Sequence, residues 1–136
     1  MQVLQNSDLG KLILRIGCAG ILLFHGVYKV RHGIQGVIDM TVNAGLPSFI
    51  AYGNYIGEFV APILVLIGFQ TRIAALVIVF NMLLSILIGH SDIMFKVNDY
   101  GGWMIETNML YLLSALALAF MGAGKYSVSK GKSPWD

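Results

Sequence analysis

Between Arg72 and His90 the chain reads RIAALVIVFNMLLSILIGH, and no charged side chain stands between the two ends of this run. An α-helix needs about 20 apolar residues to cross a hydrocarbon core about 30 Å thick. The run therefore predicts a membrane-spanning helix, and it decides how the rest of the chain is interpreted.

Three further stretches of similar length and composition lie on either side of this run, at Leu9 to Lys29, Pro47 to Phe69 and Trp103 to Gly122. Backbone polar groups must be satisfied within the chain in lipid, so such stretches form helices. We predict an all-α membrane protein with an antiparallel four-transmembrane-helix bundle. It makes up one integral membrane domain over residues 1–136 and ends in a polar basic tail at 125–136.

The composition of the chain agrees with this class. Of 136 residues, 57% are hydrophobic and 12% are charged, whereas a soluble domain carries roughly 25% charged residues. The net charge of +2 is too small and scattered for a nucleic-acid surface. A single cysteine, Cys18, excludes a disulfide scaffold and a zinc site built on clustered thiolates.

The basic residues predict the orientation of the bundle. The end of the bundle that carries both termini has more basic residues than the opposite end. They are Lys11, Arg15, Arg72, Lys125, Lys130 and Lys132. The other side has Lys29, Arg31 and Lys96. The excess of Lys and Arg on cytoplasmic loops predicts that both termini are cytoplasmic.

Ionisable side chains inside the predicted spans are candidates for function, because each costs about 2.5 to 3.5 kcal/mol to insert. They are Arg15, His25, Glu58 and Glu106, with Lys29 and His90 at span ends. A rise of about 1.5 Å per residue places His25, Glu106 and His90 at one level in the outer half of the bilayer. Glu58 lies a turn or so below them.

This placement predicts a polar pocket that opens toward the outer leaflet and is walled by Tyr52, Tyr55, Phe59 and Trp103. Carboxyl and imidazole groups can exchange protons with a bound redox ligand, so the pocket suits the headgroup of a quinone. We expect His25, Glu58 and Glu106 to be catalytic. The expected substrate-binding residues are Lys29, Tyr55, His90 and Trp103.

A purely structural alternative uses the same side chains. Arg15 with Glu58, and His25 with Glu106, would be buried ion pairs that fix the register of the helices without chemistry. Of these, Arg15 is expected to be structural under either interpretation.

Two cofactor alternatives rest on weaker signals. His25 and His90 stand on separate helices at similar depth, as axial ligands of a haem do. Two histidines with two glutamates are also a donor set for a transition metal. However, di-iron bundles typically carry the pattern Glu-x-x-His, and the sequence lacks it. We therefore assign no residue to a metal.

Several short motifs carry a resemblance to a known family. The chain has LRIG at 14–17, FHGVYK at 24–29, GLP at 45–47, Glu58 ahead of LIGFQTR at 66–72, GG at 101–102 before Glu106, and GAGKYS at 122–127. In their order and spacing the chain resembles the DoxX family of small bacterial membrane proteins.

The resemblance implies a multi-pass, four-helix protein of the bacterial inner membrane that is labelled an oxidoreductase and associated with quinone, catechol or thiol stress. His25, Lys29, Glu58, Arg72 and Glu106 stand at its motif positions. Because the chain lacks a cysteine pair, a thiol relay of its own is not supported. Electrons are expected from a soluble or membrane redox partner or a bound cofactor.

The leading hypothesis is a membrane subunit of a redox system that binds quinone or a similar small aromatic. The second is a non-enzymatic anchor or assembly partner of a larger complex. The small pair Gly53 and Gly57 is expected to serve packing within the bundle, with a homodimer contact as the alternative. The third is a proton-coupled exporter of small molecules.

Overall fold

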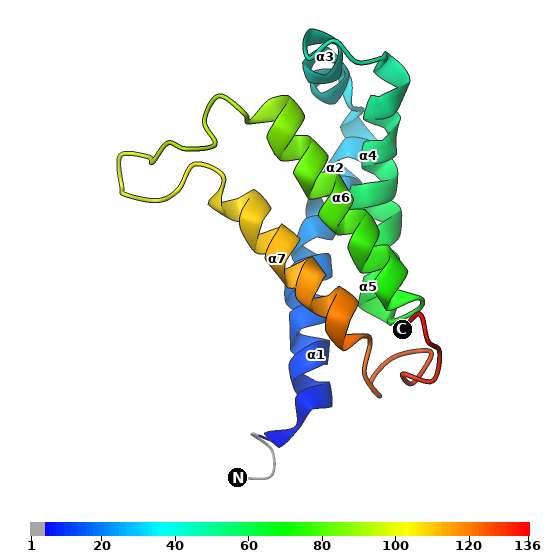
Figure 1. The fold of residues 1–136 in the computed structure, drawn as a ribbon. Coiled ribbons are helices and arrows are strands. Elements are labelled where there is room, and N and C mark those ends of the chain that lie inside the picture. The colour runs from blue at the N-terminus through cyan, green and yellow to red at the C-terminus, as the bar shows by residue number, and fades with distance from the viewer. Residues whose placement is uncertain (1–4) are drawn as a thin grey trace.

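The protein is all helical in its computed structural model, which describes residues 5–136 (Figure 1). Within those residues no β-strand forms, and one isolated antiparallel bridge joins Val97 and Trp103 in the loop before the last helix. The predicted all-α class is confirmed.

The helical elements follow the chain in five groups. The first long helix, Ser7–His32, combines α1 (Ser7–Arg15), the π-helical turn η2 (Ile16–Gly20) and α2 (Ile21–His32). The short helix α3 (Gln35–Asn43) follows. The second long helix, Ser48–Ile67, combines η3 (Ser48–Tyr52), α4 (Gly53–Tyr55), the π-helical turn η4 (Ile56–Val60) and α5 (Ala61–Ile67). The last two are α6 (Thr71–Gly89) and α7 (Glu106–Met121).

Three of these helices are long and apolar enough to cross a membrane, namely Ser7–His32, Ser48–Ile67 and Thr71–Gly89. The fourth predicted span was expected to begin at Trp103. In the structure the corresponding helix, α7, begins at Glu106 and has 16 residues. Trp103 remains in the preceding loop, where its indole nitrogen donates a hydrogen bond to the Met94 carbonyl at 2.6 Å. A carboxylate in the first turn of a helix interacts favourably with the helix dipole, which explains why the helix begins at Glu106.

The long helices run side by side, and α7 packs against α6 (Figure 1). Both termini lie near one end of the bundle, and α3 covers the opposite end. The loop between α6 and α7 projects away from the helices. This arrangement leaves the space between α2, α3, α4 and α6 for the candidate site.

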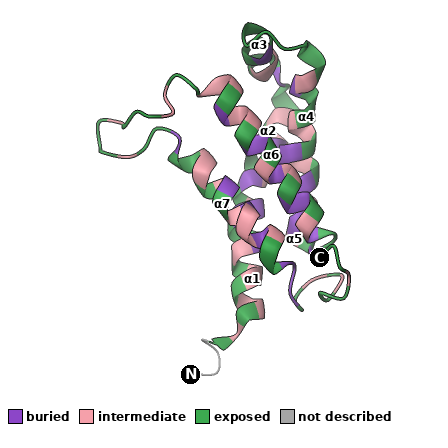
Figure 2. Ribbon diagram, viewed as in Figure 1, coloured by how far each residue is buried: buried purple, intermediate pink, exposed green. Residues whose placement is uncertain are grey.

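Buried side chains gather where the helices face one another (Figure 2). Leu22, Val65, Ile78 and Leu118 are at the centre of this core. Large apolar side chains also cover the outside of the bundle, including Phe24, which is 79% exposed. Helices that are apolar all round are typical of a membrane environment.

Candidate functional site

The site begins with two close contacts between helices. At Gly26 in α2 the backbone of Glu58 approaches so closely that an added Cβ would collide with the Glu58 carbonyl oxygen. Gly57 makes a similar contact with the side chain of Asn81 in α6. Glu58 lies in the π-helical turn η4, and such turns occur frequently at functional sites. Together these contacts bring polar side chains from three helices to one place.

The resulting polar cluster consists of Lys29, Asn54, Glu58 and Asn81. The Lys29 ammonium donates to Glu58 Oε2 at 2.6 Å and to Asn54 Oδ1 at 2.7 Å. The Asn54 amide nitrogen donates to Glu58 Oε1 at 3.1 Å and to Asn81 Oδ1 at 3.4 Å. The Glu58 side chain is 7% exposed and that of Lys29 is 23% exposed, so the cluster holds a largely buried ion pair.

One donor of the polar cluster has no partner. Asn81 is 8% exposed, and its amide nitrogen Nδ2 is buried without a hydrogen-bond acceptor. Its orientation is set by the cluster, since Oδ1 accepts from Asn54. Buried polar groups are almost always hydrogen-bonded, so this nitrogen is an unsatisfied donor within the polar cluster.

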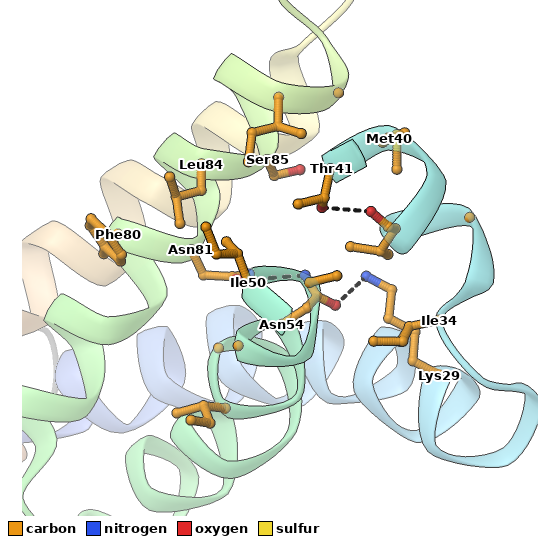
Figure 3. Close-up of a pocket in the computed structure, with 18 of the residues that line it drawn as sticks. Lys29, Ile34, Met40, Thr41, Ile50, Asn54, Phe80, Asn81, Leu84 and Ser85 are labelled. Carbon is orange, nitrogen blue, oxygen red and sulfur yellow. Dashed lines mark hydrogen bonds between the residues drawn. The ribbon is translucent and has the colours of Figure 1, made fainter. Parts of the chain in front are cut away.

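Beside the polar cluster lies a cavity of about 590 Å³, which we call the large cavity (Figure 3). Lys29, Asn54 and Asn81 line it together with Ser85 and His90. The remaining wall is mostly apolar and includes Ile34, Met40, Ile50, Phe80, Leu84 and Ile88. An apolar cavity of 300 to 1,000 Å³ with a few convergent polar groups is typical of a small-molecule site.

The large cavity reaches the surface of the bundle. Tyr28 and Phe80 both line it, and each is 63% exposed. Helix α3 covers its far end, where Met40 and Thr41 face the cavity (Figure 3). The large cavity is therefore open to the surroundings of the bundle, with Tyr28 of α2 and Phe80 of α6 at its exposed edge.

The predicted substrate-binding residues are divided by the structure. Lys29 and His90 line the large cavity, and His90 Nδ1 donates to the Ser85 carbonyl at 3.0 Å. Tyr55 is half-buried behind the cavity, with its hydroxyl 3.5 Å from the Lys29 carbonyl. Trp103 lies in the exposed loop and does not line the large cavity.

The predicted catalytic residues are divided as well. His25 and Glu58 line a second cavity of about 80 Å³, which we call the small cavity. Glu106 is exposed at the start of α7 and lines neither cavity within the described chain. The expected single pocket is therefore replaced by two cavities, because α7 begins too late to carry Glu106 into the bundle.

The expected ion pairs of Arg15 with Glu58 and of His25 with Glu106 do not form among the described residues. Within the described residues two other salt bridges form, one between Lys29 and Glu58 and one between Lys11 and Asp8. Lys29 reaches Glu58 because it lies one turn after the glycine contact at Gly26.

Arg15 is nevertheless structural, through backbone carbonyl groups. It is 1% exposed and donates to the carbonyls of Val65, Leu66, Ala123 and Tyr126 at 2.6 to 3.0 Å. The last carbonyls of a helix lack partners within it. Arg15 thus supplies donors to the end of α5 and to the segment after α7.

Asn54 and Asn81 complete the site beyond the predicted residues. Asn54 precedes Glu58 by four residues, so the two share a helix face, and this spacing is the signal that identifies it from sequence. Nine residues separate Asn81 from His90, which predicts opposite faces of a helix. Both line the large cavity because α6 ends at Gly89 and His90 leaves the helical path.

The donor set gives no metal centre: no group of three or more His, Cys, Asp or Glu side chains suited to a metal ion occurs in the part of the chain that the structure describes. His25 and His90 line separate cavities.

Apolar helices of membrane length around a buried polar cluster define a small integral membrane protein. The chain belongs to the DoxX family, whose model matches residues 10–91. It is similar to "Putative oxidoreductase CatD" of Bacillus subtilis (strain 168), with 30% identity over 119 residues, covering 88% of this chain and 84% of that protein. No solved structure matches the chain. The predicted family is confirmed, and the matched segment contains the whole polar cluster.

Proposed function

We propose that this protein is the membrane subunit of a redox system and that it binds a quinone, or a similar small aromatic with carbonyl or phenol oxygens, in the large cavity. The observation that carries the proposal is a large, mostly apolar cavity beside a polar cluster in which Asn81 Nδ2 has no hydrogen-bond partner. The name of the relative from Bacillus subtilis, an oxidoreductase, supports the redox class.

The chemistry of the cavity suits such a ligand. Asn81 Nδ2 offers a donor to one oxygen of the ligand, and the Lys29 ammonium has three N–H groups, of which two are used within the polar cluster. The apolar wall, including Phe80 and Ile50, is suited to a flat ring and a hydrocarbon tail. Entry past Tyr28 and Phe80 suits a ligand that arrives from the bilayer.

Reduction of a quinone to a hydroquinone consumes two electrons and two protons. Cys18 is the single cysteine in the sequence and is buried, so a dithiol within this chain does not supply the electrons. We assign their supply to a redox partner protein. The contribution of this chain is to bind the aromatic, orient its oxygens and supply protons from the polar cluster.

The proposal includes a placement in the membrane. Four helices cross the bacterial inner membrane, with α7 as the shortest span, and both termini are in the cytoplasm. The common position of the termini at one end of the bundle (Figure 1) supports an even number of crossings. On this placement α3 and the large cavity are in the outer half.

Menadione binding to the purified protein in lipid nanodiscs tests the proposal, by isothermal titration. Asn81→Leu removes the unpartnered donor, and we expect the Kd for menadione to rise about tenfold, since leaving a buried acceptor of the ligand unsatisfied costs about 1 to 3 kcal/mol. The control Leu83→Ala alters an exposed α6 residue that lines neither cavity of the described chain. It should bind like the unaltered protein.

Absence of menadione binding to the unaltered protein, together with an organic extract that contains no quinone, would reject the proposal in favour of a structural anchor. Equal affinity of Asn81→Leu and the unaltered protein would reject Asn81 as a contact of the ligand.

A further inference from the structure

The small cavity lies against Glu58 on the side away from the large cavity. It is lined by Leu22, His25, Glu58, Met82, Thr107, Asn108 and Tyr111. Among the described residues the two cavities share no lining residue. Glu58 connects them, because it lines the small cavity and both of its carboxylate oxygens accept hydrogen bonds from residues of the large cavity.

The small cavity has the size and polarity to hold water. Its volume is about 80 Å³, whereas one water needs roughly 10 to 15 Å³ of such volume and two to four polar partners. Most of its lining residues carry a polar group, and hydrogen bonds are offered from two helices, by Glu58 in η4 and by Thr107 and Asn108 in α7. A dry cavity of this size is expected only where the lining is apolar.

His25 links the small cavity to the outside of the bundle. It is exposed, lines the cavity and meets Tyr111 edge to face, with the ring centroids 6.2 Å apart. Histidine is the side chain best suited to accept and release protons near neutral pH. The titratable groups that face Glu58 are thus His25 and Lys29 from α2 and Tyr111 from α7.

We propose that the small cavity is a water-filled proton entry: a proton passes from the His25 imidazolium through water to the Glu58 carboxylate, and from Glu58 to Lys29 beside the large cavity. The inference deepens the proposed function and rests on it. It assigns Glu58 as the connection between the small cavity and the ligand, and His25 as the entry from the surface of the bundle.

The transfer is balanced at each step. A partner protein with a reduced redox group supplies the electrons, and the reduced quinone oxygen takes a proton from the Lys29 ammonium. Glu58 receives a proton from His25 through the water and passes it to the Lys29 amine, which restores the original ion pair. His25 regains its proton from outside, and a second passage completes the hydroquinone.

The test uses the protein in liposomes at a concentration well above both the menadione concentration and the Kd, so that nearly all of the menadione is bound. Sodium dithionite supplies the electrons in place of the partner, and stopped-flow absorbance follows hydroquinone formation. In His25→Ala we expect the rate to fall about tenfold while the Kd for menadione stays within about twofold. Because His25 is exposed, added imidazole should restore the rate.

His32→Ala is the matched control. His32 lies on the same helix, is exposed, and lines neither cavity in the described chain. Its rate should match that of the unaltered protein, with no response to imidazole. An unchanged rate in His25→Ala, or a reduced rate that imidazole does not restore, overturns the proton entry. Failure of the unaltered protein to bind menadione overturns the proposed function instead.

A second measurement needs no ligand. Met82 is 2% exposed, but it lines the small cavity. If water fills that cavity, hydroxyl radicals formed in it should oxidise Met82 at a rate within about tenfold of that of Met104, which is 41% exposed. Oxidation of Met104 without oxidation of Met82 shows a dry cavity and overturns the inference.

Discussion

At the scale of single residues, the Lys29 and Glu58 side chains form the most consequential contact in the molecule. Two opposite charges taken out of water lose hydration, and their attraction repays this only when the geometry and the remaining hydrogen bonds are good. Here Asn54 contacts both members of the pair. The pair is thus held in one geometry beside the large cavity.

Removing one partner of this pair should cost much more than removing both charges. Lys29→Met leaves the Glu58 carboxylate buried without its cation, and we expect the free energy of unfolding to fall by about 3 to 5 kcal/mol. The double variant Lys29→Met with Glu58→Gln should lose clearly less. Thermal unfolding in detergent measures both, and a double variant as unstable as the single one would contradict this account.

At the scale of elements, the π-helical turn η4, which contains Gly57, and Gly26, which packs against it, determine where Glu58 lies. The backbone of Glu58 packs on Gly26, and the side chain of Asn81 packs on Gly57. A glycine that is closely approached by a neighbouring helix is a common feature of membrane bundles. The polar cluster is therefore built by backbone contacts as much as by its own hydrogen bonds.

Gly26→Ala should separate α2 from η4. Its Cβ would collide with the Glu58 carbonyl, so we expect a loss of about 3 kcal/mol in unfolding free energy, at the upper end of the range for overpacking. On the same long helix, the matched change Gly17→Ala meets nothing within 4 Å. It should stay within about 1 kcal/mol of the unaltered protein. Equal stability of the two variants would show that the close contact has no energetic weight.

Arg15 connects elements at the other end of the bundle. Arg15→Met leaves buried carbonyl oxygens at the end of α5 and after α7 without donors. We expect a loss of about 3 kcal/mol or more, since unsatisfied buried groups cost roughly 1 to 3 kcal/mol each. Lys11→Met removes a half-buried ion pair of one helix turn, between groups 3.8 Å apart, and should cost less than about 1 kcal/mol. Chemical unfolding of both variants in detergent gives the comparison.

At the scale of the whole molecule, the exposed apolar surface indicates a lipid environment, and the position of the termini bears on the orientation of the bundle in the membrane. Large apolar side chains such as Phe24 and Phe120 point outward along the helices. This surface is suited to lipid rather than water. The termini lie near one end of the bundle and α3 lies at the other (Figure 1). If the bundle crosses the bilayer, α3 is therefore on the opposite side of the membrane from the termini.

Reporter fusions measure this orientation. Green fluorescent protein fused after Asp136 should fluoresce, because it folds in the cytoplasm, and alkaline phosphatase at the same position should be inactive. Alkaline phosphatase fused after Asp99, in the loop between α6 and α7, should be active. Phosphatase activity at Asp136 would reject a cytoplasmic C-terminus, and with it the four-span placement.

The sequence by itself determined the helices, the membrane class and the family. Hydropathy and helix-end signals are local properties, so they could be read along the chain without knowledge of neighbours. They failed at Trp103, which the pattern placed in a span, because the indole hydrogen bond to Met94 that keeps it in the loop joins residues nine apart.

Only the tertiary structure decided which polar groups meet. Equal depth along separate helices suggested that His25, Glu106 and His90 share one pocket, but depth does not fix rotation, crossing angle or the point where a helix begins. The π-helical turn, the glycine contacts and the late start of α7 set those quantities. They pair Glu58 with Lys29 and divide the predicted site between two cavities, because a contact between helices depends on how both are rotated.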